Sequence, residues 1–181
     1  MQLTRLLVPS FMQMLKGFSN WLDKAAAHEK DADALMTLRL APDMFPLDAQ
    51  VRFACFQALE PTYRLRGMTA PDDVIAIRKE GLISNDQAGS FADAKACIAS
   101  TIASLANLAD NALDGGIDKP IALDLPNGIV FDMTGEQYAR DWCLPQFYFH
   151  VTTAYAILRH QGVVLGKPDY VEHMSAYMRH A

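Results

Sequence analysis

The sequence has few cysteines, and their spacing suggests neither a disulfide framework nor a zinc site. Cys55, Cys97 and Cys143 are the three cysteines in 181 residues, and no two of them form a C-x-x-C pair. An odd number of widely separated cysteines argues against a disulfide-stabilised secreted domain and favours a reducing compartment. We therefore expect three small buried thiols in a cytoplasmic protein.

Basic residues are in the minority as well. The chain has 16 Lys and Arg against 21 Asp and Glu, a formal net charge of −5, and its basic residues are dispersed. Nucleic acid is therefore not an expected partner, because binding it needs a basic patch that neutralises phosphates.

No apolar run is long enough to cross a bilayer, which argues against a membrane protein. The start, MQLTRLLVPSFMQML, has no A-x-A cleavage signature and is interpreted as mature protein.

The common catalytic signatures are also missing. The sequence contains no G-x-S-x-G, no P-loop and no G-x-G-x-x-G, so the usual nucleophile and nucleotide-binding motifs are absent. Internal repeats and low-complexity tracts are absent too. A chain of 181 residues with 51% hydrophobic residues is predicted to form one domain, 1–181, with a substantial core.

What the chain does contain is helical periodicity. A first helix is predicted from near Pro9, a residue favoured in the first helical turn. A second helix should run from Pro46 to Gly67, and Pro61 inside it should kink or break the helix. A third helix is expected from about Ser90, a candidate N-cap.

Two segments depart from this periodicity. Residues 67–89 hold most of the glycine, proline and polar punctuation and are predicted to form an irregular connection. Residues 119–133 show alternating apolar residues on both sides of Asn127-Gly128, a strong signal for a β-hairpin because both turn residues tolerate positive φ.

The last long helix follows the hairpin. Thr134 and Gln137 resemble a capping box that opens a short helix. Pro145 should then open the last helix and Gly162 should end it, which leaves 163–181 as a C-terminal tail. The predicted fold class is all-α: a four-helix bundle with a small β-hairpin inserted before the last helix.

The last helix, QFYFHVTTAYAILRHQG, carries His150 on its apolar side. An imidazole placed there costs free energy unless its nitrogens find partners. Gln146 is one turn away, and Gln50 and Gln57 share a face of the second helix, so a glutamine–histidine network is one interpretation. A metal ligand and a proton-transfer group are the alternatives. A hydrogen-bonded core histidine is the commonest outcome for such a residue.

The segment around this histidine resembles the DinB/YfiT-like superfamily. In that superfamily the last helix carries H-x-x-x-H-R-G-x followed by L-R-x-x-G. Aligning the second motif on Leu158, Arg159 and Gly162 places the second motif histidine on His150 and the first on Gln146. The phrases RLAPDMFPLDAQV and LPQFYFHVTTAYAILRHQGVVLGKPDY are still more similar to one bacterial branch, a family known as a domain of unknown function. The likeness extends from about residue 3 to residue 170.

This resemblance implies a DinB-like bundle that is usually a dimer. Superfamily members with a metal site bind a divalent ion through three histidines, one from the second helix and two from the last. The corresponding positions here are approximately Gln50, Gln146 and His150. Amide oxygens replace imidazole poorly as ligands of zinc or nickel. We therefore predict a degenerate site without a cofactor, with a divalent metal such as zinc, nickel or iron as the alternative.

Two functions follow. The first is a homodimeric binding or structural module with an unknown small-molecule ligand. The second is a thiol- or metal-dependent small-molecule transferase or isomerase that uses His150 for catalysis, in the manner of some superfamily members. Whether the chain is an enzyme stays open at this point. The enzyme hypothesis predicts a substrate-sized pocket at His150.

The other histidines, one cysteine and the outward face of the last helix have different interpretations. His160 is interpreted as a solvated helix-end residue, and His28, His173 and His180 fit no ligand spacing. Cys55 is a candidate nucleophile if it neighbours His150. The last helix is apolar nearly all round, so its outward face should be covered by a partner subunit in a two-fold dimer, by the hairpin or by the tail. The residues of that face are Tyr148, Thr152, Tyr155 and Arg159.

Overall fold

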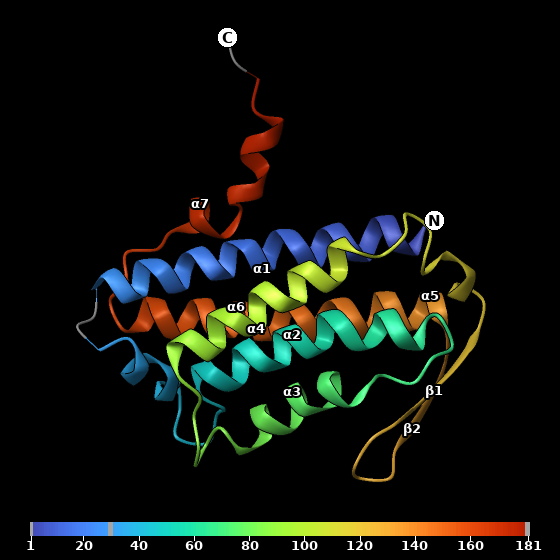
Figure 1. Ribbon diagram of the computed structural model, residues 1–181, viewed down its shortest axis with the longest axis horizontal. Coiled ribbons are helices and arrows are strands. Elements are labelled where there is room, and N and C mark those ends of the chain that lie inside the picture. Colours follow the sequence, from blue (N-terminus) through green and yellow to red (C-terminus); the bar gives the residue numbers. More distant parts are fainter. Residues whose placement is uncertain (1, 29–30, 180–181) are drawn as a thin grey trace.

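The computed structural model describes residues 2–28 and 31–179. Its regular secondary structure is helical except for one β-hairpin (Figure 1). Four long helices pack around a shared core: α1 (Leu3–His28), α2 (Leu47–Arg64), α4 (Phe91–Ala106) and α6 (Leu144–His160). Each packs on two neighbours, since α2 contacts α4 and α6 while α1 contacts the same two helices. The predicted four-helix bundle is confirmed.

Helix α1 begins earlier than Pro9. It starts at Leu3, which is fully buried, and includes Pro9 in its second turn. Asp114 caps this start by accepting hydrogen bonds of 2.9 Å from both the backbone N–H and the hydroxyl of Thr4. Burial of the first turn and this distant cap extend the helix past the point that proline preference alone predicts.

Pro61 does not break α2, so that part of the prediction is wrong. The helix continues for three residues to Arg64, and Gly67 follows with φ of +76°. The turn around Pro61 is held by packing and by Arg64, whose Nε donates to Glu60 Oε1 at 2.6 Å. The helix therefore tolerates the loss of the one backbone donor that proline lacks.

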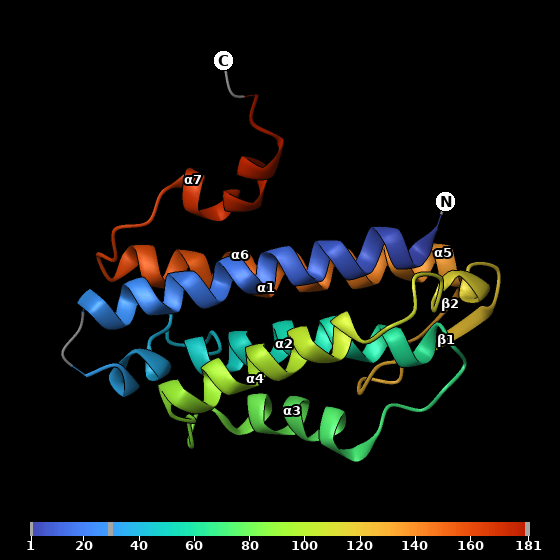
Figure 2. The same cartoon turned by 45° about the horizontal axis from the view of Figure 1, so that its top comes forward.

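Residues 67–89 are not an irregular connection, because they contain a helix, α3 (Asp72–Ile83). This helix lies on the outside of α2, away from α1 (Figures 1 and 2). Only Val74 and Gly81 are buried in it, so its apolar periodicity is weak. Polar contacts hold it instead: Ser84 donates to the buried Asp48 at 2.5 Å, and Glu80 pairs with Arg52.

The hairpin forms one residue later than expected, from β1 (Pro120–Asp124) and β2 (Val130–Thr134). The loop between the strands has five residues instead of a two-residue turn. Gly128 has φ of +81° and its N–H donates to the Leu125 carbonyl at 3.0 Å. Asn127 keeps a negative φ and accepts from the Ile129 N–H at 3.2 Å with its side chain. Only the glycine therefore uses the left-handed conformation.

The predicted short helix and the last helix are continuous. The capping box of Thr134 and Gln137 is confirmed and opens α5 (Gly135–Gln137). A π-helical turn (Tyr138–Cys143) then joins α5 directly to α6. Gly162, with φ of +86°, ends α6 in a Schellman motif, in which the Val163 N–H donates to the Leu158 carbonyl at 3.1 Å.

The C-terminal segment contains α7 (Lys167–Tyr170) and a 3-10 turn (Glu172–Tyr177). It packs on α1 through Tyr170, whose ring stacks on Trp21 at 5.4 Å, and its end projects from the bundle (Figure 2). None of the helices in the described residues has the length and hydropathy that a transmembrane span requires.

Candidate functional site

The candidate site lies along the interface of α2 and α6, which run in opposite directions (Figure 1). Residues near the start of α2 therefore face the middle of α6, and residues near the end of α2 face the π-helical turn before α6. Side-chain hydrogen bonds join the two elements at both ends: Gln50 to His150 and Glu60 to Tyr138. We call these the imidazole end and the carboxylate end.

At the imidazole end, His150 Nδ1 lies 2.9 Å from Gln50 Oε1. The Gln50 side chain is almost fully buried, and its Nε2 donates to the Phe45 carbonyl at 3.1 Å. The amide oxygen therefore faces the imidazole and can only accept, which assigns the proton of the neutral ring to Nδ1. His150 Nε2 then carries the lone pair.

Aromatic rings surround this imidazole. The Phe53 ring of α2 lies 5.1 Å from it and the Phe149 ring 5.3 Å, measured between centroids. Burial among these groups lowers the pKa of His150 to about 4. His150 is partly exposed, so it lies at the edge of the interface. The ring is therefore neutral at physiological pH.

The predicted glutamine–histidine network forms only in part. Gln50 and His150 are bonded, whereas Gln146 and Gln57 make no side-chain hydrogen bond with residues 2–28 or 31–179. Gln146 is partly exposed one turn before His150. Gln57 belongs instead to a pocket near the carboxylate end.

At the carboxylate end, Glu60 is 8% exposed and both of its oxygens are hydrogen-bonded. Arg64 Nε donates to Oε1 at 2.6 Å, and the Tyr138 hydroxyl donates to Oε2 at 2.5 Å. Tyr138 is fully buried, and burial raises the pKa of its phenol. Arg64 also donates to the Ala122 carbonyl of β1 at 3.1 Å, which ties the hairpin to α2.

A pocket of about 650 Å³ opens beside this cluster. Its walls come from α2, α3, β1, the hairpin loop and the π-helical turn, which contributes both Tyr138 and Trp142. A π-helical turn inside a helix is rare and is often found at functional sites. Sequence reasoning missed this cluster. The available signal was Glu60 and Arg64 at i,i+4 on the predicted second helix, but nothing in the sequence places Tyr138 against them.

Comparison with protein families matches residues 3–171 to the family described as "Domain of unknown function (DUF1993)". The chain belongs to the DUF1993 family. The crystal structure of a DinB family member protein from Shewanella denitrificans is also similar, with 32% identity over 93% of this chain and 91% of that chain and a TM-score of 0.76. A search of curated proteins gave no match. This DUF1993 protein is thus DinB-like, and the resemblance noted from the sequence is confirmed.

The donor set of this DUF1993 chain does not fit the three-histidine metal site implied by the superfamily. Gln50 directs its amide oxygen at the imidazole and its amide nitrogen at a backbone carbonyl, so both ends of the group are engaged. Gln146 offers only another amide. Within the described residues, no three His, Cys, Asp or Glu side chains are grouped so that they could hold a metal ion. One imidazole with two amides is a poor transition-metal ligand set.

The remaining candidates of the DUF1993 chain lie elsewhere. Cys55 is fully buried, burial raises its pKa, and its thiol interacts with Cys97 and Thr101 of α4, so it does not neighbour His150. All three cysteines are free, but Cys97 is partly exposed, which corrects the expectation of three buried thiols. His160 is exposed at the end of α6, as expected, and His180 lies outside the described residues.

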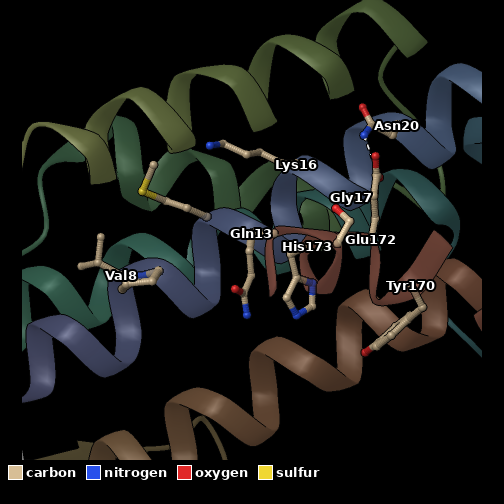
Figure 3. A pocket seen from close by; sticks show the side chains of 12 residues that line it. Val8, Gln13, Lys16, Gly17, Asn20, Tyr170, Glu172 and His173 are labelled. Atoms are coloured by element: carbon tan, nitrogen blue, oxygen red, sulfur yellow. Dashed lines mark hydrogen bonds between the residues drawn. The ribbon is translucent and has the colours of Figure 1, made fainter. Parts of the chain in front are cut away.

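A second pocket, of about 590 Å³, separates α1 from the C-terminal segment (Figure 3). Gln13 of α1 and His173 of the segment line it, and Asn20 donates to Glu172 at its edge at 2.9 Å. Thr152 and Tyr155, on the outward face of α6, contact Tyr170. The tail therefore covers part of that face, which was one of the three coverings expected from the sequence.

Proposed function

We propose that this DUF1993 protein is a metal-free, DinB-like binding module rather than a metalloenzyme. The observation that carries the proposal is the 2.9 Å hydrogen bond between His150 and Gln50. It joins an amide to an imidazole at two of the three positions where superfamily members use histidines to hold an ion. The group that replaced the ligand now satisfies the histidine that remains.

Elemental analysis tests this proposal directly. Protein purified without chelators or a histidine tag should contain far less than one equivalent of zinc, nickel or iron. The double variant Gln50→His, Gln146→His is the positive control, because it restores three imidazoles; it should bind zinc at least about 100-fold more tightly than wild type. Either single variant supplies only two imidazoles and should fall between. A full equivalent of metal in the wild type, lost in His150→Ala, would overturn the proposal.

An enzyme that uses His150 is the second candidate. The observation in its favour is that Nε2 carries a lone pair and has no hydrogen-bond partner in residues 2–28 or 31–179. Two observations rank it lower. A pKa of about 4 makes the ring a weak base at neutral pH. His150 also does not line any of five pockets found in residues 2–28 and 31–179, among them the two described above.

The working form that we propose is a homodimer in the cytoplasm. The end of the C-terminal segment carries large apolar side chains in solvent, with Met174 51%, Tyr177 78% and Met178 65% exposed. Clustered exposed apolar groups are typical of an interaction surface. Sedimentation equilibrium should give the mass of a dimer for the wild type and a lower mass, closer to the monomer, for the double variant Tyr177→Ser, Met178→Ser. A wild-type monomer at micromolar concentration would contradict the dimer.

The proposal of a cytoplasmic location is supported by the three free thiols, which suit a reducing compartment.

A further inference from the structure

The pocket at the carboxylate end is lined by both apolar and polar side chains. Its apolar lining includes two partly exposed aromatic rings, Phe56 and Trp142, together with Ile75, Leu123 and Leu125. Its volume of about 650 Å³ is within the range of pockets for small organic ligands. The flat rings at its wall favour a flat, apolar ligand body.

The buried carboxylate does not make this pocket cation-selective. Both Glu60 oxygens already accept hydrogen bonds, from Arg64 and from Tyr138. Arg64, in contrast, donates to Glu60 and to the Ala122 carbonyl, and its guanidinium also lies 5.8 Å from the centroid of the Tyr138 ring. These contacts engage fewer than its five N–H donors. The cluster therefore presents spare donors to the pocket rather than spare acceptors.

A second guanidinium lines the same pocket from α3. Arg78 is exposed, and it has no hydrogen bond or ion pair with any residue in 2–28 or 31–179. Two guanidiniums with unused donors suit a carboxylate, whose two oxygens match their planar geometry. Asp124 at the rim opposes an anion, but it is exposed, so solvent and salt screen its charge.

We infer that this pocket binds a small molecule with a flat apolar body and one carboxylate group. The body lies against Phe56 and Trp142, and the carboxylate accepts hydrogen bonds from Arg78 and Arg64. The inference supplies a ligand for the proposed binding module. It does not depend on the metal content of the imidazole end, since the two sites use different residues.

Two tryptophans make the test specific. Trp142 lines this pocket, whereas Trp21 is fully buried and stacks on Tyr170, which lines the pocket beside α1. The probes are 2-naphthoate and its neutral counterpart, 2-naphthylmethanol, titrated into chelator-treated full-length protein. Their binding is followed by the two indole N–H signals in ¹H–¹⁵N spectra, with Trp142→Phe used for assignment. 2-Naphthoate should shift the Trp142 signal and leave Trp21 in place, and the alcohol should bind at least about fivefold more weakly.

The matched variants are Arg78→Gln and Lys79→Gln, which remove one positive charge from adjacent exposed positions of α3. Arg78→Gln should weaken 2-naphthoate binding about tenfold and leave the alcohol unchanged, because it removes one charge-assisted contact. Lys79→Gln should stay within about twofold of wild type, and Asp124→Asn should bind 2-naphthoate more tightly. Any of four results would overturn the inference. Arg78→Gln and Lys79→Gln could lose equal affinity for 2-naphthoate, or the wild type could bind both probes equally well. Alternatively, the Trp21 signal could shift instead of the Trp142 signal, or neither could shift at a millimolar concentration of 2-naphthoate.

Discussion

The two ends of the α2–α6 interface satisfy buried polar groups in different ways. At the imidazole end, a neutral ring and a neutral amide share one hydrogen bond of 2.9 Å between Phe53 and Phe149. At the carboxylate end, Glu60 is held by a guanidinium and a phenol beside a pocket of about 650 Å³.

The two ends therefore suit different purposes: the imidazole end suits close packing, and the carboxylate end suits binding of a charged ligand. A neutral pair requires no counter-charge, so apolar rings can pack closely around it at little electrostatic cost. A buried carboxylate needs several aligned donors, and the arginine that provides one of them still has donors left for a ligand. We therefore propose that charge is recognised not at the end that resembles the superfamily's metal site but about three helical turns away along α2.

The comparison predicts the largest stability loss at the carboxylate end. Tyr138→Phe removes the hydroxyl that donates to Glu60 Oε2 at 2.5 Å and leaves a buried carboxylate oxygen without its donor. We expect a loss of about 2 kcal/mol in the free energy of unfolding at neutral pH. Urea denaturation measures this value.

Tyr155→Phe is the matched control for that variant. Tyr155 lies on α6 and packs against Trp21 and Tyr170, but its hydroxyl makes no hydrogen bond within the described part of the chain. The same chemical change there should cost less than about 0.5 kcal/mol. Similar losses in both variants would mean that the contact with Glu60 contributes little.

The fold was largely predictable because the four long helices have apolar stripes and clear terminal signals. Ser90 caps α4 through a hydrogen bond from the Asp93 N–H, and Gly162 ends α6, as their residue types indicate. Helix α3 was missed because its attachment is polar and depends on distant partners. Gly81, which reads as a helix breaker, allows close contact instead: a Cβ there would lie 2.8 Å from the Phe53 ring.

The candidate site was predictable only where a sequence pattern marks it. Gln50 and His150 could be paired because helical spacing placed a buried histidine and a face of glutamines on two helices, and the resemblance then aligned Gln50 with a ligand position. Their hydrogen bond forms part of the expected network. The meeting of Glu60 with Tyr138 depends on the antiparallel contact of α2 with a π-helical turn, and π-helical geometry has no recognisable sequence signature. Long-range pairing of this kind follows from tertiary packing rather than from local spacing.

A smaller effect, visible only in acid, is expected at the imidazole end. Burial lowers the pKa of His150 to about 4, whereas an unfolded imidazole titrates near 6.5. Well above about pH 6.5 the imidazole is neutral in both the folded and the unfolded state, and there it has no effect on pH dependence. As the pH falls from about 6.5 to about 4, the unfolded state takes up the proton first, so the folded state loses stability. Because the ring is partly exposed, we expect a loss of about 1–2 kcal/mol.

His150→Gln isolates this contribution, since glutamine can still bond with Gln50 but cannot titrate. Urea denaturation measures the free energy of unfolding at about pH 7.5 and at about pH 4.5. Between these pH values His150→Gln should lose less stability than wild type. The control His160→Gln replaces an exposed imidazole on the same helix and should lose as much stability as wild type. At about pH 7.5 Tyr138→Phe should lower stability in the wild type and in His150→Gln by similar amounts, because its partner lies at the other end of the interface. If wild type and His150→Gln lose equal stability in acid, the imidazole is not held neutral, and the contrast between a neutral end and a charged end of this interface is lost.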